Sequence, residues 1–227
     1  VCIGPPAAKD SYLNIPAILT AAAITGADAI HPGIGFMSEN ATFAEMVEEH
    51  GFAFIGPTPD HIRNMGDKVT AKQTVKDLGL PTVPGSSGGV ETIEEARKVA
   101  EETGYPVLIK AAAGGGGKGM KVAQTADDLD EAYRLARSEA KAAFGNDEVY
   151  MEKYLDRPRH IEVQLLGDTH GNAVHFGERD CSLQRRHQKV IEEAPSPGLN
   201  DNERKEIGAL AADVVAKMGY RGVGTIE

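Results

Sequence analysis

The sequence has no tryptophan and only two cysteines, and aromatic residues make up 5% of the chain. Cys2 and Cys181 are far apart and fit no metal-ligand spacing, so the sequence predicts neither a zinc module nor a disulfide framework. Each cysteine is expected to be a small buried or strand residue. Because disulfides belong to oxidising compartments, the scarcity of cysteine favours a reducing one.

Long apolar runs are also missing. The best candidate, Ala17–Ala29, is too short to cross a membrane and contains Gly26 and Asp28. No secretory signal peptide is visible. Lys and Arg number 24 against 34 Asp and Glu, and this net charge of −10 argues against nucleic acid as a partner. A bound nucleotide would need positive charge gathered locally, and Gln184–Lys189 is the densest basic run.

The rest of the composition is that of a globular protein. The 227 residues are 41% hydrophobic and 26% charged, enough for one large domain or two to three small ones. The chain starts on the strand-like stretch Val1–Pro5, without a methionine, and stops on the strand-like stretch Gly222–Glu227. We therefore expect an interior piece of a larger protein.

Helix and strand patterns alternate in the first quarter of the chain. Asn14 can cap a helix that has Pro16 in its first turn and closes near Gly26. Asn40 or Ser38 can cap a second helix that ends at Gly51. Strands are expected at Val1–Pro5, Ala29–Gly33 and Phe52–Pro57. This strand–helix–strand order predicts an α/β unit with a parallel sheet.

The later part predicts an α+β arrangement. Pro57–Gly66 is interpreted as a connector, and the Ser, Gly and Pro content of Thr82–Val90 indicates a domain boundary. Helices are expected at Asp67–Leu78, Thr92–Thr103, Thr125–Phe144 and Asp201–Met218. Strands are expected before Lys110 and at Met120–Gln124, Val149–Leu155, His160–Gly167, Asn172–Cys181 and Tyr220–Glu227.

A glycine loop after an apolar strand is the most informative stretch. Val107–Ile109 leads to Lys110, and Gly114–Gly117 with Gly119 leave backbone amides open to an anion. This combination is typical of phosphate handling. The alternative is a surface hairpin that binds no ligand.

Other glycine motifs fit this loop less well. A P-loop needs Ser or Thr after its lysine, and Lys118 is followed by Gly119. A dinucleotide fingerprint must open a helix, whereas Met120–Gln124 has the pattern of a strand. A kinase would need an Asp-Phe-Gly motif, which is absent from the sequence. The loop is therefore predicted to be the tip of a β-hairpin that forms a lid.

Six stretches of the sequence form a recognisable set: His31–Asn40, Met65–Lys68, Ile109–Gly119, Met151–Leu155, Pro158–His160 and Glu178–Lys189. With these stretches in this order, the chain closely resembles the biotin carboxylase component of the biotin-dependent carboxylases, within the ATP-grasp superfamily. The resemblance runs from Val1 to Glu227.

The resemblance implies a division of the chain. Residues 1–66 would form a partial Rossmann-like pre-ATP-grasp domain, and residues 67–81 a linker helix. An ATP-grasp fold would follow, with a lid subdomain at 82–154 and a truncated antiparallel-sheet subdomain at 155–227.

The resemblance also implies functions for individual residues. Lys68 and Lys110 would reach the nucleotide phosphates, Lys110 with a catalytic role, and Lys189 would bind bicarbonate. Glu227 would be a metal ligand. The remaining nucleotide contacts would be Gly116, Gly117, Glu152, Lys153, Tyr154, Leu155, His160, Gln184 and His187.

From the residues alone, plainer interpretations stay open. Lys68 could be a solvated helix lysine, and Met151–Leu155 could show ordinary strand alternation. His160, Glu162 and Gln164 share one face of a strand, which could line a cleft or face water.

The implied activity is ATP-dependent carboxylation of biotin on a biotin carboxyl carrier protein, with bicarbonate as carbon source and carboxyphosphate as intermediate. The implied cofactors are ATP with Mg²⁺ or Mn²⁺, and carrier-bound biotin is the substrate. A homodimer, a carboxyltransferase partner and a cytoplasmic location are also implied. The alternatives are another ATP-grasp ligase, such as a carbamoyl phosphate synthetase, and a non-catalytic nucleotide-binding module.

In the family, further metal ligands and a catalytic arginine lie beyond the position of Glu227. The 227-residue chain is therefore expected to bind nucleotide weakly at best and not to turn over.

Overall fold

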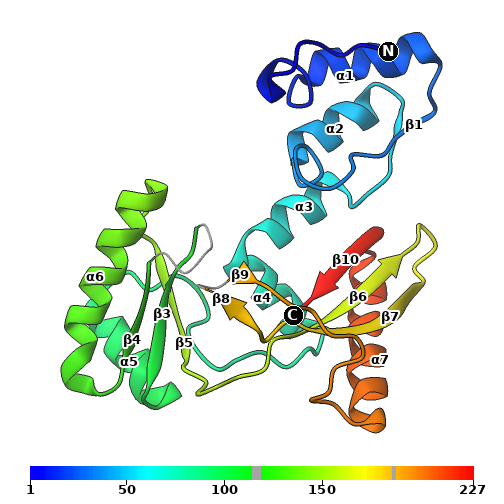
Figure 1. Cartoon of the computed structure of the whole chain (residues 1–227). Helices are drawn as coiled ribbons and strands as arrows, with labels where there is room; N and C mark the ends of the chain where they lie inside the picture. Colours follow the sequence, from blue (N-terminus) through cyan, green and yellow to red (C-terminus); the bar gives the residue numbers. More distant parts are fainter. Residues whose placement is uncertain (114–118, 186–187) are drawn as a thin grey trace.

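The computed structural model describes residues 1–113, 119–185 and 188–227. Figure 1 shows three parts in chain order: an N-terminal unit, a unit containing α5 and α6, and a sheet flanked by α7. Each part has its own cluster of buried apolar side chains. In the described residues, no helix combines the length and apolar character that a membrane span requires.

The N-terminal unit contains the predicted strand–helix–strand motif. Its elements are η1 (Ala8–Asp10), α1 (Ile15–Thr25), β1 (Ala29–Ile30), α2 (Ala41–Glu49) and β2 (Ala53–Phe54). The two short strands pair in parallel, and the buried side chains of Phe43, Val47 and Phe54 form the core between them and α2. Asn14 and Asn40 cap α1 and α2 as predicted.

Two predictions for this region were wrong. Val1–Pro5 is not a strand, because none of the described residues pairs with it and its side chains are mostly exposed. The stretch interpreted as a connector contains α3 (Pro59–Gly66). Thr58 accepts a hydrogen bond from the His61 amide, and Pro59 occupies the first turn, where its missing N–H costs nothing. Helix α4 (Lys68–Asp77) follows at once, capped by Asp67.

The middle unit is an antiparallel sheet backed by two helices. Its elements are α5 (Ile93–Thr103), β3 (Val107–Ala111), β4 (Met120–Ala123), α6 (Ala126–Phe144) and β5 (Val149–Lys153). The strand order is β4–β3–β5, and the apolar faces of α5 and α6 pack on one side of the sheet. The predicted hairpin is confirmed, since Lys110 on β3 pairs with Met120 on β4.

The last unit is a second antiparallel sheet with the order β10–β6–β7. Helix α7 (Asp201–Met218) packs on one face of it through Val163, Leu165, Ala211 and Val215. Figure 1 shows the short β8 and β9 strands between this sheet and the middle unit. The strands are β6 (Ile161–Gly167), β7 (Ala173–Asp180), β8 (Gln184–Arg185), β9 (Gln188–Lys189) and β10 (Gly222–Ile226).

The N-terminal unit contacts the turn between α7 and β10. The His61 Nε2 atom lies 3.3 Å from the Met218 carbonyl, and its ring centroid lies 5.3 Å from that of Tyr220. Arg221 Nε donates to the Gly56 carbonyl at 3.1 Å, and its guanidinium pairs with Glu48. The first and last parts of the chain are therefore joined directly.

Candidate functional site

Two neighbouring strands bring Lys110 and Glu152 together. Lys110 on β3 donates from Nζ to one carboxylate oxygen of Glu152 on β5 at 3.0 Å. Lys72 on α4 donates to the other oxygen at 3.1 Å. We call Lys72, Lys110 and Glu152 the lysine–glutamate cluster. All three side chains are largely shielded from water. The opposite charges within the cluster therefore compensate for the hydration that each ionised group has lost.

Lys110, Lys72 and Glu152 stabilise one another in their ionised forms. Burial alone would lower the pKa of Lys110, but the Glu152 carboxylate and Tyr150 outweigh it and the pKa is raised. Burial would raise the pKa of Glu152, but Lys110 and Lys72 lower it. Burial, and then the charge of Lys110, lowers the pKa of Lys68 at the start of α4. Lys68 and Lys110 thus repel each other, the Glu152 carboxylate acts against this repulsion, and a bound anion would offset it further.

The strand that ends in Lys153 continues as Tyr154 and Leu155. The Lys153 amide donates to the Pro84 carbonyl and the Tyr154 amide to the Pro106 carbonyl. The Lys153 ammonium donates to the carbonyls of Gly104 and Tyr105, beside the end of α5. Leu155 is exposed, and its amide has no protein acceptor among the described residues. Among the backbone N–H groups of Lys153, Tyr154 and Leu155, only that of Leu155 is available to donate a hydrogen bond to a nucleotide base.

A second group of charges lies on the other sheet, around Glu162 on β6. Arg179 on β7 and Lys189 on β9 both donate to its carboxylate. Lys189 also lies 3.4 Å from the carboxylate of Glu227, which follows β10. We call Glu162, Arg179, Lys189, Glu227 and His160 the Lys189 cluster.

Glu162 is the buried centre of this cluster, with a side chain that is 6% exposed. Burial would raise the pKa of Glu162, but Lys189 and Arg179 lower it. The pKa of Lys189 is raised, because Glu162 and Glu227 outweigh the effect of burial. Lys189 therefore stays an ammonium group at neutral pH and is held at a defined point.

His160 and Gln184 are brought together as a pair. The Gln184 amide nitrogen lies 2.9 Å from His160 Nδ1 and donates to the Cys181 carbonyl at 3.0 Å. His160 Nε2 lies against the Glu227 carboxylate. This assignment of the Gln184 amide makes Nδ1 an acceptor, and Nε2 makes no hydrogen bond to any described residue despite lying close to Glu227.

Three side chains of the Lys189 cluster could contribute to a metal site. One ligand atom each from His160, Glu162 and Glu227 lie within 4.8 Å of one another. Mg²⁺ prefers carboxylate oxygens, and Glu162 already accepts from two cations, whereas the Glu227 side chain is 55% exposed. Glu227 is thus the more accessible of the two carboxylates, although it also faces His160 and Lys189.

Three predicted site residues, Gly116, Gly117 and His187, lie outside the described residues. The flanking hairpin is described on both sides of the glycine loop. Gly119 has a φ of +69°, and a Cβ there would come within 2.9 Å of the Ala111 side chain.

Several residues of these clusters were not predicted from the sequence. Lys72 and Tyr150 beside Lys110, and Arg179 beside Glu162, depend on strand register and on where α4 lies. One pattern could have identified Lys72, because it follows Lys68 by four residues and so lies on the same face of α4.

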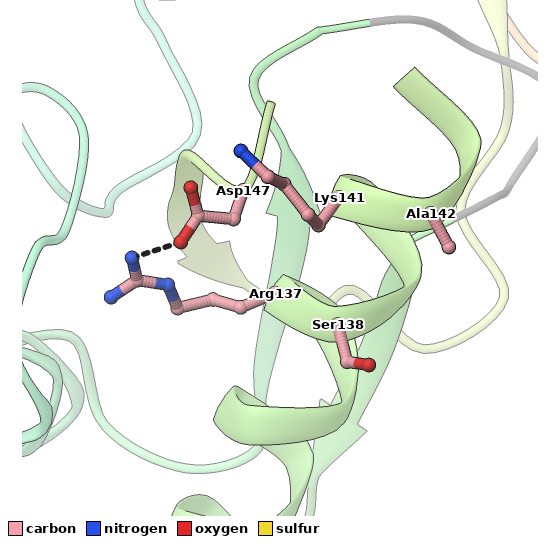
Figure 2. Close-up of a pocket in the computed structure, with 5 residues that line it drawn as sticks. All are labelled: Arg137, Ser138, Lys141, Ala142 and Asp147. Carbon is pink, nitrogen blue, oxygen red and sulfur yellow. Dashed lines mark hydrogen bonds and ion pairs between the residues drawn. The ribbon is translucent and has the colours of Figure 1, made fainter. Parts of the chain in front are cut away.

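A surface hollow of about 440 Å³ on α6 contains no residue of either cluster. Figure 2 shows Arg137 and Lys141 pointing toward Asp147, with Ser138 and Ala142 on the helix beside them. Arg137 and Asp147 form an ion pair. Because this hollow lies away from both clusters and its arginine and aspartate are paired with each other, it is not a second candidate for the function.

Two family models divide the chain between them. Residues 1–62 match "Biotin carboxylase, N-terminal domain", and residues 67–227 match "Carbamoyl-phosphate synthase L chain, ATP binding domain". The second match and the observed fold define an ATP-grasp domain, as predicted.

Known proteins are similar along the whole chain. Biotin carboxylase from Haemophilus influenzae is 59% identical and that from Arabidopsis thaliana chloroplasts 56%, each over 100% of this chain. The chain spans 51% and 42% of these relatives, about half their length.

Solved structures are similar as well. A Campylobacter jejuni biotin carboxylase–β,γ-ATP complex superposes with a TM-score of 0.88 at 52% identity, over 99% of this chain and 50% of that one. The biotin carboxylase domain dimer of Hydrogenobacter thermophilus 2-oxoglutarate carboxylase, with MgADP, ADP and bicarbonate, gives 0.85 at 48% identity. That match covers 95% of this chain and 48% of the other. The chain belongs to the biotin carboxylase family.

Proposed function

We propose that this chain binds ATP and bicarbonate as part of an enzyme that carboxylates biotin on a carrier protein. The observation that carries the proposal is the position of Lys110. It stands beside Lys68 at the start of a glycine hairpin, partly buried, with its charge held by Glu152. Two mutually repelling cations at an amide-rich loop form a site that a polyphosphate would stabilise.

The lysines near the glycine hairpin suit ATP, and Lys189 on the other sheet suits bicarbonate. Lys68 and Lys110 would hold the phosphates and stabilise the charge that gathers on the leaving diphosphate. The Lys189 ammonium would hold bicarbonate so that its oxygen attacks the γ-phosphorus, which gives carboxyphosphate and ADP. Carboxyphosphate then releases phosphate and transfers CO₂ to a ureido nitrogen of biotin.

The nucleotide contacts follow from the same geometry. The amide of Leu155, which has no acceptor in the described part of the chain, would donate to the adenine ring beside Glu152, Lys153 and Tyr154. Gly116, Gly117, Gln184, His160 and His187 would complete the site. Glu227 would hold the Mg²⁺ that neutralises the phosphates.

The comparisons support this proposal through the ligands of the relatives. The Campylobacter jejuni structure is a β,γ-ATP complex, and the Hydrogenobacter thermophilus structure is a complex with MgADP, ADP and bicarbonate. We extend these ligands to the present chain. We also propose the division at residues 66, 81 and 154, a homodimer, partnership with a biotin carrier protein and a carboxyltransferase, and the cytoplasmic location expected of a bacterial member of the family.

The test is MgADP binding by calorimetry. We expect saturable binding by the chain and at least tenfold weaker binding by Lys110→Met, because the variant loses a phosphate contact. Lys98→Met removes an equally charged but exposed lysine on α5 and should bind as the parent does. Lack of binding by the parent, or equal binding by Lys110→Met, would contradict the proposal.

Biotin carboxylation is distinguished from carbamoyl phosphate synthesis by a second assay. In a longer protein that carries this chain, free biotin should stimulate bicarbonate-dependent ATP hydrolysis. A protein without this stimulation, but with an ammonia-dependent one, belongs to the other class of ligase.

A further inference from the structure

A cavity of about 270 Å³ lies between α4 and the segment 82–88, beside the candidate nucleotide site. Lys72, Gln73 and Lys76 line it from the helix, Ser87 and Gly88 from the segment, and Tyr150 from β5. Lys68, Lys110 and Lys189 do not line it. None of the residues proposed to hold ATP and bicarbonate lines the cavity, which adjoins the lysine–glutamate cluster through Lys72.

The charge of the cavity is positive in an acidic protein. Two lysines line it, and no aspartate or glutamate does so among the described residues. Lys72 is engaged with Glu152 at 3.1 Å, whereas Lys76 has no partner in the described part of the chain. The whole chain carries a net charge of −10, so most of its surface repels anions. The local excess of cations therefore attracts an anion to this cavity in particular.

Hydrogen-bond donors are available on the opposite wall. The amide N–H groups of Ser87 and Gly88 have no acceptor within residues 1–113, 119–185 and 188–227. The hydroxyl group of Ser87 also has no protein partner there. Neighbouring backbone amides in a glycine-containing turn are a common way to bind phosphate oxygens.

Apolar side chains form the remaining walls. Val69, Val83 and Pro84 line the cavity together with Tyr150, which is 5% exposed. An inorganic anion alone would leave the half-buried Val69 and Val83 and the exposed Pro84 against water. A ligand with a small organic body next to its anionic group would cover them and gain the corresponding hydrophobic stabilisation.

We propose that this cavity is a binding site for a small organic phosphate. Its phosphoryl group would lie between Lys76, Lys72 and the amides of Ser87 and Gly88, and its organic group against Val69, Val83 and Tyr150. Since Lys72 is shared with Glu152, the ligand would draw Lys72 away and leave Glu152 to Lys110 alone.

The proposal is tested by titrating the 227-residue chain with inorganic phosphate and with phenyl phosphate at constant ionic strength. Binding is read from the NMR amide resonances of Ser87 and Gly88. We expect saturable shifts, with phenyl phosphate at least fivefold tighter than phosphate. Lys76→Met should weaken both at least fivefold, and Lys76→Arg should restore most of the affinity.

Two further variants separate this site from other sources of binding. Lys205→Met removes an exposed lysine on α7 and controls for net charge. Lys68→Met should weaken MgADP binding but leave the phenyl phosphate shifts at Ser87 and Gly88 within twofold. A chain that fails to bind MgADP but passes the phenyl phosphate test would overturn the proposed function and leave this site intact.

The opposite results would overturn the proposal. Linear shifts without saturation, or equal effects of Lys76→Met and Lys205→Met, would show that the cavity selects no anion. Equal affinity for phosphate and phenyl phosphate would show that the cavity recognises the phosphate group alone and gains nothing from an organic group. Lys76 is exposed, so its variants should fold, and their melting temperatures verify this.

Discussion

Asp180 is a buried residue whose hydrogen bonds connect several segments next to the Lys189 cluster. Its buried carboxylate accepts from the Ser182 amide at 3.1 Å, from Arg159 at 2.7 Å and from the Ser196 hydroxyl at 3.0 Å. Its backbone pairs with Glu193. These bonds attach the strand that carries Arg179 to the segment that follows Lys189.

A pH prediction follows from these bonds. Hydrogen bonds from Ser182, followed by Arg159, lower the pKa of Asp180 to about 2. A carboxylate with a lowered native pKa stabilises the fold above its unfolded pKa of about 3.9. The contribution, on the order of 2 kcal/mol, should be lost as the pH falls from about 4 to 2.

Urea unfolding at pH 5, 4, 3 and 2.5 measures this effect. Asp180→Asn should be less stable than the parent at pH 5 and should show a shallower decline below pH 4. Asp10→Asn, in the exposed η1 turn, is the matched control. If both variants followed the parent curve, the hydrogen bonds to Asp180 would not account for the pH dependence.

For single residues, the sequence predicts which ones belong to the candidate site better than it predicts which residues they contact. Lys110 and Lys189 stand in recognisable motifs. Strand register between β3 and β5 sets the contact of Lys110 with Glu152, 42 positions away, and the placement of β9 beside β6 sets that of Lys189 with Glu162, 27 positions away. No local pattern carries that information.

Elements with local boundary residues were predicted best. Helix α7 begins and ends as expected, because Asn200 forms a capping box with Glu203 and Gly219 takes the left-handed conformation after the last turn. The connector prediction for Pro57–Gly66 failed because it overlooked Pro59, a residue favoured in a first helical turn, which here begins α3. Val1–Pro5 failed because apolar character alone does not supply a partner strand.

The segment 82–90 runs beside β5, and one glycine in it permits this. Gly85 bridges to Glu152, and a Cβ on Gly85 would lie 2.1 Å from the Met151 carbonyl oxygen. Gly85→Ala should therefore destabilise the chain by about 2 kcal/mol or more, since backbone must move to admit the methyl group.

Gly88→Ala is the control for this substitution. A Cβ on Gly88 meets nothing within 4 Å, so its effect should stay within about 0.5 kcal/mol. Thermal unfolding of the two variants provides the comparison. Similar melting temperatures would mean that the segment does not lie against β5.

For the whole molecule, the contact between the first unit and the last is the feature that the sequence could not predict. Arg221 reaches Gly56 and Glu48, more than 160 positions earlier in the chain. Family resemblance predicted the order of the parts, but packing between them depends on surfaces that no periodicity describes.

Removing this contact should loosen the N-terminal unit. Arg221→Met loses a hydrogen bond and an ion pair and should cost about 1–2 kcal/mol. We expect faster amide exchange in residues 48–58, with little change in β3 and β5. Arg134→Met, an exposed arginine on α6, is the control. Unchanged exchange in Arg221→Met would show that the contact does not hold the unit.

The order β10–β6–β7 also gives the second sheet an open margin. In the described residues β10 pairs with β6 alone, so the outward amides and carbonyls of Gly222–Ile226 have no neighbouring strand. No proline or lysine interrupts this margin, and Val223 lies exposed on it. Such an edge is a template for strand addition. In concentrated solutions of the chain, self-association should begin there.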